Sequence, residues 1–306
     1  MIRIDTEELL KLKNYYLIGG TSAVNSSSSS KESGETDTSL SLEDALRILP
    51  KDPKKLIELF NLDDPNNRYI LLRLLGRDYL EKLTEELDKS SMLLIMQFFT
   101  VAKLMSMLQK LPKMKLLEML QQIFTPEEML KMMPEKYMDK FLTNDGLKKE
   151  ELLKSLMGLP PEALSKMIQS VTGKPPQNVN PSMSKDEQSA AMVQELSQMN
   201  PQNFKKALVS MEKEEKIKII MDLTEKDKDK WLLFPQEAYL STVEMLPKDM
   251  MIQSMNALET SDMAEMINIL PDEMLTQSLT LVHPEVFAES LLQNNTDLLA
   301  QLLTAA

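Results

Sequence analysis

From Pro235 to the C-terminus, apolar and polar positions recur with a period of about twelve residues. Each of the first four segments carries apolar residues at i, i+4 and i+7, a spacing that places them on one face of an α-helix. These residues are Tyr239/Val243/Leu246, Met251/Met255/Leu258, Met263/Ile267/Leu270 and Leu275/Leu279/Val282. The pattern predicts a series of short amphipathic helices separated by corners.

The starts of these segments agree with that prediction. Four of the six begin with proline, which fits the first turn of a helix because the N–H that it lacks has no partner there. Acidic residues follow, where the positive end of the helix dipole favours them. Helices this short are marginal alone, since isolated helices need roughly 12–15 residues to persist in water. We therefore expect each unit to bury its stripe on its neighbours, as in a solenoid. The alternative is an irregular helical domain whose helices have similar lengths.

Similar segments occur earlier in the chain and begin at Pro112, Pro126, Pro134, Leu147 and Pro160. Thr125 offers a capping side chain, followed by proline at the first helical position and an acid, Glu128, at the third, which predicts a helix start. The spacing of Ser184 and Glu187 predicts a second capped helix start. Residues 92–111 predict one long, buried central helix. Residues 212–230 mix lysines with acids and predict a solvated helix face.

The fold class follows from composition as well as periodicity. Leu, Met, Lys and Glu dominate and only 7 glycines are present, which favours helix over strand. We predict an all-α protein built as a right-handed-type superhelix of short antiparallel helices, armadillo-like or α-solenoid, with two helical lobes. Its expected parts are a short N-terminal helix and Ser-rich flexible tether (1–40), a helical domain (41–172), a Pro-rich linker (173–183) and a helical-repeat domain (184–306).

The net charge of −12 is unevenly distributed. Residues 235–306 contain eleven acids and one base, Lys248. Nucleic acid is an improbable partner for such a surface, because phosphate contacts need clustered Lys and Arg. A protein with a basic or amphipathic-helical surface is the natural partner. The alternative is that the acids only solubilise the outer face and complement helix N-termini.

Candidate chemistry is sparse. There is no cysteine and a single histidine, His283, so thiolate chemistry, a zinc site and a histidine-based triad are not expected. The carboxylate pairs Glu127/Glu128 and Asp272/Glu273 fall at predicted helix starts, where capping explains them. We predict no enzymatic activity, no cofactor and no metal. The 25 methionines either fill the core or line an adaptable groove for amphipathic helices.

The run from Leu246 to Leu292 resembles the short-helix superhelices of two bacterial families. These are the N-terminal domain of MgtE-type magnesium transporters and the armadillo-like middle region of the flagellar rotor protein FliG. His283-Pro284, followed by Phe287-Ala288 and Leu291-Leu292, is similar to the opening of a helix in the rotor family. Val282 and Glu285 depart from that family's pattern. The resemblance implies a scaffold surface in a flagellar or other membrane-associated assembly.

We therefore expect a cytoplasmic, non-enzymatic adaptor that binds a protein partner, with no direct membrane insertion and an undetermined oligomeric state. The alternative is a substrate or chaperone of a flagellar or type III-like export system that uses the N-terminal segment as its address. The candidate partner-binding residues are Glu259, Asp262, Glu265, Asp272, Glu273, His283, Pro284, Glu285, Phe287 and Glu289.

Overall fold

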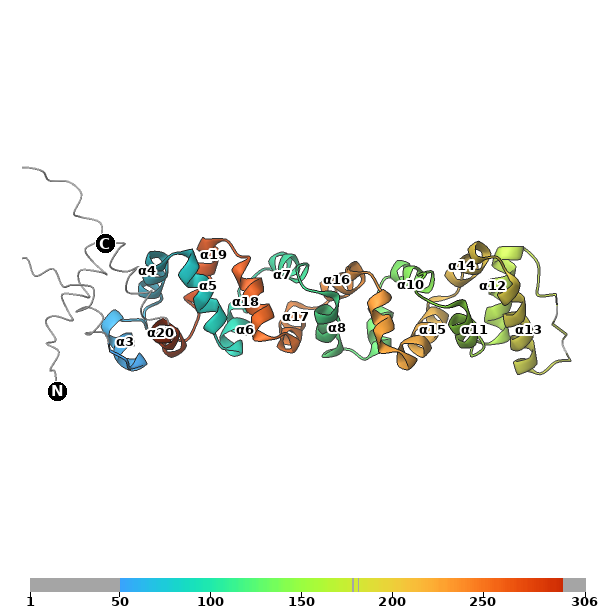
Figure 1. Ribbon diagram of the computed structural model, residues 1–306, viewed down its shortest axis with the longest axis horizontal. Coiled ribbons are helices and arrows are strands. Elements are labelled where there is room, and N and C mark those ends of the chain that lie inside the picture. Colours follow the sequence, from blue (N-terminus) through green and yellow to red (C-terminus); the bar gives the residue numbers. More distant parts are fainter. Residues whose placement is uncertain (1–49, 178, 181, 294–306) are drawn as a thin grey trace, which may run out of the picture. The chain divides into compact units, whose positions relative to one another are not determined.

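The computed structural model describes residues 50–177, 179–180 and 182–293, and every regular element within them is a helix (Figure 1). The all-α prediction is therefore confirmed for this part of the chain. The predicted N-terminal helix and tether (1–40) and the last predicted repeat lie outside the described residues.

The chain forms two compact units. Unit 1 combines the residues up to Met107 with those from Glu259 onward, and unit 2 comprises Leu108–Leu258. The Pro-rich segment 173–183 lies between two helices of unit 2 that pack on each other.

Unit 1 pairs helices from the two ends of the sequence. Its helices are α3 (Pro53–Phe60), α4 (Pro65–Leu75), α5 (Arg77–Glu86), α6 (Lys89–Gln97), α7 (Val101–Leu108, whose last residue belongs to unit 2), α18 (Thr260–Asn268), α19 (Asp272–Leu279) and α20 (Pro284–Gln293). In reverse order of sequence, α3 packs on α20, α4 on α19, and α5 on α18 (Figure 1).

Unit 2 follows the same reverse order. Its helices are α8 (Lys113–Gln121), α9 (Pro126–Met132), α10 (Glu135–Leu142), α11 (Lys149–Leu156), α12 (Pro161–Thr172), α13 (Lys185–Gln198), α14 (Pro201–Val209), α15 (Lys213–Lys226), the 3-10 helix η1 (Lys228–Leu233), α16 (Gln236–Glu244), α17 (Lys248–Ser254) and the 3-10 helix η2 (Met255–Ala257). Here α12 packs on α13 and α14, α10 and α11 on α15, and α8 on α16.

The predicted apolar stripes form the core. All twelve stripe residues of the four segments between Pro235 and Val282 are buried. The main partners of α18, α19 and α20 are α5, α4 and α3, helices from a distant part of the sequence. A stripe on a short helix specifies which face must be buried. It does not specify which helix covers that face.

Prolines mark the helix starts in two ways. Pro53, Pro65 and Pro126 occupy the first helical turn, as expected. In α16, α17 and α19 the proline is instead the N-cap residue, one position before the helix. An N-cap residue has extended backbone angles, which proline adopts readily. The capping boxes of Thr125/Glu128 and Ser184/Glu187 are both formed.

The long helix expected across residues 92–111 is wrong, because the chain breaks into α6 and α7. The Thr100 hydroxyl accepts a hydrogen bond from the Lys103 N–H at 3.3 Å and so caps the start of α7. Phe99 turns into the core, whereas the neighbouring Phe98 is 61% exposed. A threonine inside an apolar run was the signal for a cap, since its side chain competes for backbone N–H groups.

The mixed-charge stretch at α15 is not wholly a solvated face. Lys216 is only 1% exposed, and its Nζ pairs with the carboxylates of Glu135 and Asp139 on α10, the latter at 2.7 Å. Burial alone would lower the pKa of Lys216, but the hydrogen bonds and negative charges of the two acids outweigh it and raise the pKa. The positive charge of Lys216 is thus retained between α10 and α15.

Several helices of unit 2 begin with a donor side chain that reaches the carbonyl end of another helix. Lys149, the first residue of α11, donates to the carbonyls of Ser197 (2.7 Å) and Met199 (3.0 Å) at the end of α13. Side chains tilt toward the N-terminus of their own helix, so a first-turn residue can reach beyond its helix start. The carbonyls at a helix end lack intrahelical partners, and a cation there also meets the negative end of the dipole.

This arrangement, which we call the N1 clamp, recurs at the first residue of three more helices of unit 2. Lys213 of α15 donates to the carbonyl of Lys131 at 2.6 Å. Lys113 of α8 donates to the carbonyls of Leu232 (2.7 Å) and Phe234 (3.3 Å), and Gln236 of α16 donates to those of Gln109 (3.2 Å) and Leu111 (2.8 Å). Each clamp joins segments that are far apart in the sequence.

We expect Lys149→Met to lower the free energy of unfolding by about 1 kcal/mol, because two carbonyls lose a charged donor while the aliphatic stem is kept. Lys148→Met is the matched control, since the adjacent Lys148 is exposed and should change stability little. Urea unfolding followed by circular dichroism measures both. Equal effects of the two substitutions would contradict the clamp.

Two buried tyrosines provide a second test of the packing. The Tyr79 hydroxyl has no hydrogen-bond partner, whereas that of Tyr239 donates to the carbonyl of Trp231. Tyr239→Phe should lower the free energy of unfolding by about 1 kcal/mol. Tyr79→Phe should leave it unchanged or raise it, because a desolvated hydroxyl without a partner is removed. Urea midpoints compare the two, and a larger loss for Tyr79→Phe would disprove this assignment.

Candidate functional site

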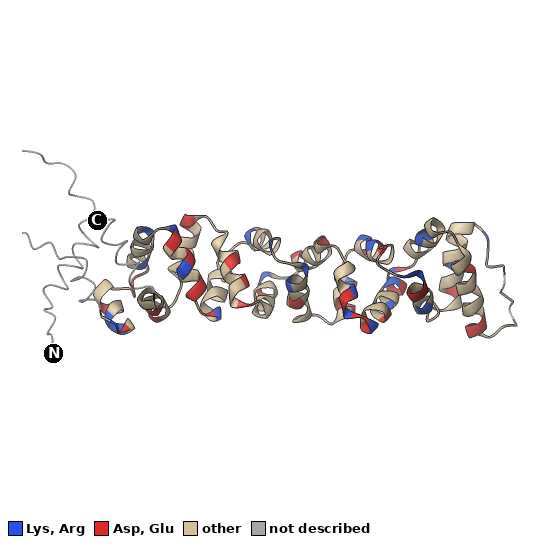
Figure 2. Cartoon of the chain, in the orientation of Figure 1, with Lys and Arg blue, Asp and Glu red and all other residues tan. Residues whose placement is uncertain are grey.

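The predicted partner-binding residues all lie on α18, α19 and α20 or at the corners before them, within unit 1. Most have exposed side chains, and these are Glu259, Glu265, Asp272, Glu273, His283, Glu285 and Glu289. Asp262 and Pro284 are half-buried. Figure 2 shows acidic residues on α18 and α19 and also on the neighbouring α5.

Two members of this set have structural roles of their own. Phe287 is fully buried where α20 packs on α3, so its side chain belongs to the core and not to a contact surface. His283 caps α20, because its Nδ1 accepts a hydrogen bond from the Glu285 N–H at 3.4 Å. A position before a proline-initiated helix explains this histidine without a metal or a reaction.

Helix starts account for many of the acids. Glu259 and Asp262 form the capping box of α18. Asp272 and Glu273 lie in the first turn of α19, and Glu285 lies in that of α20. Glu265 and Glu289 lie within their helices, where no cap requires an acid. The described residues of this segment, 259–293, contain seven acids and no Lys or Arg. The two interpretations of the acids are therefore compatible, because capping carboxylates remain exposed.

The methionines mainly fill the core. In the two methionine-rich segments 129–138 and 250–266, the buried methionines are Met129, Met133, Met138, Met251, Met255, Met263 and Met266. Met132 and Met250 are half-buried. Side chains that are covered within the fold cannot line an open groove, so these positions favour packing.

The structure adds Arg77, which the sequence pattern did not single out. Arg77 is the first residue of α5 and forms the N1 clamp of unit 1. Its guanidinium donates to the carbonyls of Leu270 (2.8 Å) and Asn268 at the end of α18. It also pairs with Glu81 at 3.0 Å and with Asp272 at 2.9 Å. A positive charge at a helix start is unfavourable, because the N-terminal end of the helix dipole is also positive. The position of Arg77 in the sequence therefore indicates that it interacts with groups outside its own helix start.

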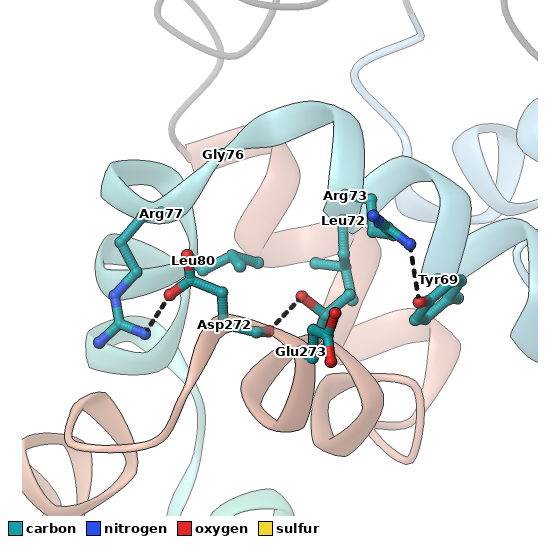
Figure 3. Close-up of a pocket in the computed structure, with 9 residues that line it drawn as sticks. Tyr69, Leu72, Arg73, Gly76, Arg77, Leu80, Asp272 and Glu273 are labelled. Atoms are coloured by element: carbon teal, nitrogen blue, oxygen red, sulfur yellow. Dashed lines mark hydrogen bonds and ion pairs between the residues drawn. The ribbon is translucent and has the colours of Figure 1, made fainter.

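A small open cavity lies beside this clamp, between α4, α5 and the start of α19 (Figure 3). Its volume is about 200 Å³. The residues that line it are Tyr69, Leu72, Arg73, Gly76, Arg77, Leu80, Asp272, Glu273 and Thr276. We call it the α4–α5–α19 pocket. It contains two of the predicted partner-binding acids, Asp272 and Glu273.

The lining of this pocket combines charge with an apolar floor. Leu72 and Leu80 are buried beneath it. Arg73 donates to the Tyr69 hydroxyl at 3.2 Å and lies over the Tyr69 ring, 5.7 Å from its centroid. Gly76 has a φ of +79°, which allows the abrupt corner between α4 and α5, and a Cβ added there would meet no atom within 4 Å. The pocket therefore extends to the backbone.

Two further searches concern only the described residues. None of their helices combines the length and apolar character that crossing a bilayer requires. None of their His, Asp and Glu side chains gather in groups of three or more suited to holding a metal ion.

We expect Arg77→Met to lower the free energy of unfolding by about 2 kcal/mol, because carbonyls at the end of α18 lose a charged donor. Asp272→Asn should cost less than about 1 kcal/mol, since the Asp272 side chain is 69% exposed and water screens its ion pair. Urea unfolding of both variants makes the comparison. An equal loss would show that the ion pair, and not the carbonyl contacts, gives Arg77 its role.

Comparison of the chain with family models, curated proteins and solved structures returns no match.

Proposed function

We propose that the protein is a non-enzymatic adaptor or scaffold that binds a protein partner through the exposed face of α18, α19 and α20. One observation carries the proposal. These helices direct their apolar stripes into the core of unit 1 and leave seven acids, without any Lys or Arg, on the segment that they form. A segment whose charged residues are all of one sign favours a partner of opposite charge and accelerates its association.

The proposed partner carries a basic surface, presented by a basic amphipathic helix. The repeated pairing of short helices in each unit supports an armadillo-like superhelix as the underlying architecture, an arrangement suited to extended binding surfaces. We further propose that the protein acts in the cytoplasm, in an assembly of the flagellar or membrane-associated kind that the sequence resembles.

Deletion of the C-terminal segment would be a poor test, because α18, α19 and α20 cover α5, α4 and α3 in the core. Charge neutralisation retains the fold. The test variant replaces four exposed acids of unit 1, in Glu265→Gln, Glu273→Gln, Glu285→Gln and Glu289→Gln. The matched control replaces four exposed acids of unit 2, in Glu150→Gln, Glu162→Gln, Glu214→Gln and Glu225→Gln. Both variants change the net charge equally.

We expect affinity purification from the native cell, quantified by mass spectrometry, to show partners that the unit 1 variant loses and the unit 2 control retains. Their recovery should also fall as salt rises, because exposed charges are screened beyond roughly 10 Å at 0.1 M salt. Retention of every partner by the unit 1 variant would disprove this surface. Equal loss in both variants would show that only overall charge matters.

A further inference from the structure

We infer that the α4–α5–α19 pocket binds a small zwitterion, a free α-amino acid, between Arg73 and Glu273. This ligand is a dissolved molecule, so the inference goes beyond the proposed protein partner and does not depend on it. Its grounds are that the two positive and two negative side chains of the pocket balance, and that only one of the two opposite pairs is closed.

The closed pair is Arg77 and Asp272. Arg77 begins α5 and Asp272 begins α19, and an ion pair of 2.9 Å joins their side chains. The same guanidinium also pairs with Glu81 and donates to carbonyls at the end of α18. A ligand that entered on this side of the pocket would have to displace an existing ion pair.

The open pair is Arg73 of α4 and Glu273 of α19. Both line the pocket, and neither has an ion pair within the part of the chain that the structure describes. Arg73 is held on Tyr69, one turn earlier on α4, by a hydrogen bond of 3.2 Å to the hydroxyl and by the ring beneath it. In Figure 3 a dashed line joins Arg77 to Asp272, whereas Arg73 is joined only to Tyr69. Two opposite charges therefore border one space without neutralising each other.

This arrangement favours a ligand that carries both charges. An anion would pair with Arg73 but meet the carboxylate of Glu273, and a cation would meet the guanidinium. A zwitterion avoids both repulsions, because its carboxylate accepts from Arg73 while its ammonium donates to Glu273. The hydrogen bond to Tyr69 uses one N–H of the guanidinium, and an arginine has five.

The size and floor of the pocket favour the α-groups over a long side chain as the recognised part. Cavities that bind drug-sized molecules have volumes of about 300–1,000 Å³, whereas this pocket has about 200 Å³ and is open to solvent. Leu72 and Leu80 are 0% and 2% exposed, so they offer no apolar surface to a ligand. The side chain of the amino acid would therefore point out of the pocket, and many α-amino acids could bind.

The start of α5 supports the same orientation. Its N-cap residue, Gly76, lines the pocket and has no side chain with which to cap the first N–H groups of the helix. N–H groups at a helix start attract a carboxylate, because they lack intrahelical partners and lie at the positive end of the dipole. The carboxylate of the ligand is thus expected between Arg73 and the start of α5, with its ammonium toward Glu273.

The test uses the full chain, labelled with ¹⁵N, and L-alanine as the probe. L-Alanine should shift the amide resonances of Gly76, Glu273 and Thr276, with a Kd on the order of 1 mM, as suits a ligand of so few atoms. N-acetyl-L-alanine keeps the carboxylate without the ammonium, and L-alaninamide keeps the ammonium without the carboxylate. Each should bind at least fivefold more weakly than L-alanine.

Four variants separate the pocket from the general charge of unit 1. Arg73→Gln and Glu273→Gln should each weaken L-alanine binding at least fivefold. The matched controls, Lys55→Gln and Glu58→Gln, remove one exposed charge of each sign from α3 and should leave the affinity within twofold. The spectra away from the pocket report that each variant is folded. Absence of shifts at the pocket, equal binding of either single-charge probe, or equal effects of pocket and control variants would each overturn the inference.

The outcome is distinguishable from failure of the proposed function, because the titration needs no partner protein. If L-alanine does not bind but the fourfold unit 1 variant loses its partners, the acidic face remains the docking surface and the pocket is not a ligand site. If L-alanine binds and that variant keeps every partner, the ligand site stands and the proposed docking surface is wrong.

Discussion

Burial of one apolar stripe per short helix, against a helix from a distant part of the chain, is the constraint on which the rest of this structure depends. Helices of seven to fourteen residues gain too little from their own backbone hydrogen bonds to persist alone. Each fully buried Leu or Met contributes about 1.5–3 kcal/mol, and every helix brings only a few such residues. Helix formation and long-range packing are therefore coupled, and in unit 1 neither α3–α5 nor α18–α20 has a complete core without the other.

The N1 clamps follow from this coupling. Short helices have many ends for their length, and each end presents carbonyls without intrahelical partners. A donor at the first position of a helix packed against such an end satisfies these carbonyls. It also fixes the position of one helix along the axis of the other. Lys149 in unit 2 and Arg77 in unit 1 both do so. Besides these carbonyls, Arg77 pairs with one acid of the proposed surface, Asp272, but not with the adjacent Glu273. The clamp at Arg77 thus leaves Glu273 exposed beside the α4–α5–α19 pocket, and structural stability and the proposed binding surface share the same residues.

Local physics made much of the helical structure predictable. The capping boxes at Thr125 and Ser184 form as expected, because a cap depends only on residues three positions apart. The hydrophobic pattern does not predict the break between α6 and α7, because the Thr100 cap decides where α7 begins. Lys216 was placed on a solvated face because its partners, on α10, are far from it in sequence. Within the candidate site, the exposed acids of α18–α20 follow from the uneven distribution of charge along the sequence. Arg77 and the pocket do not, because three helices from the two ends of the sequence must meet to form them.

The sequence by itself determined the all-α class, most helix starts and the residues of the core face, since these depend on interactions within one or two helical turns. Only the tertiary structure decided which helix covers which stripe. In unit 1 the helices pair in reverse order of sequence, α3 with α20, α4 with α19 and α5 with α18. The physical reason is that an apolar stripe is non-directional. It requires burial, but many partners can provide it, and the choice among them rests on side-chain shape and on clamps such as that of Arg77.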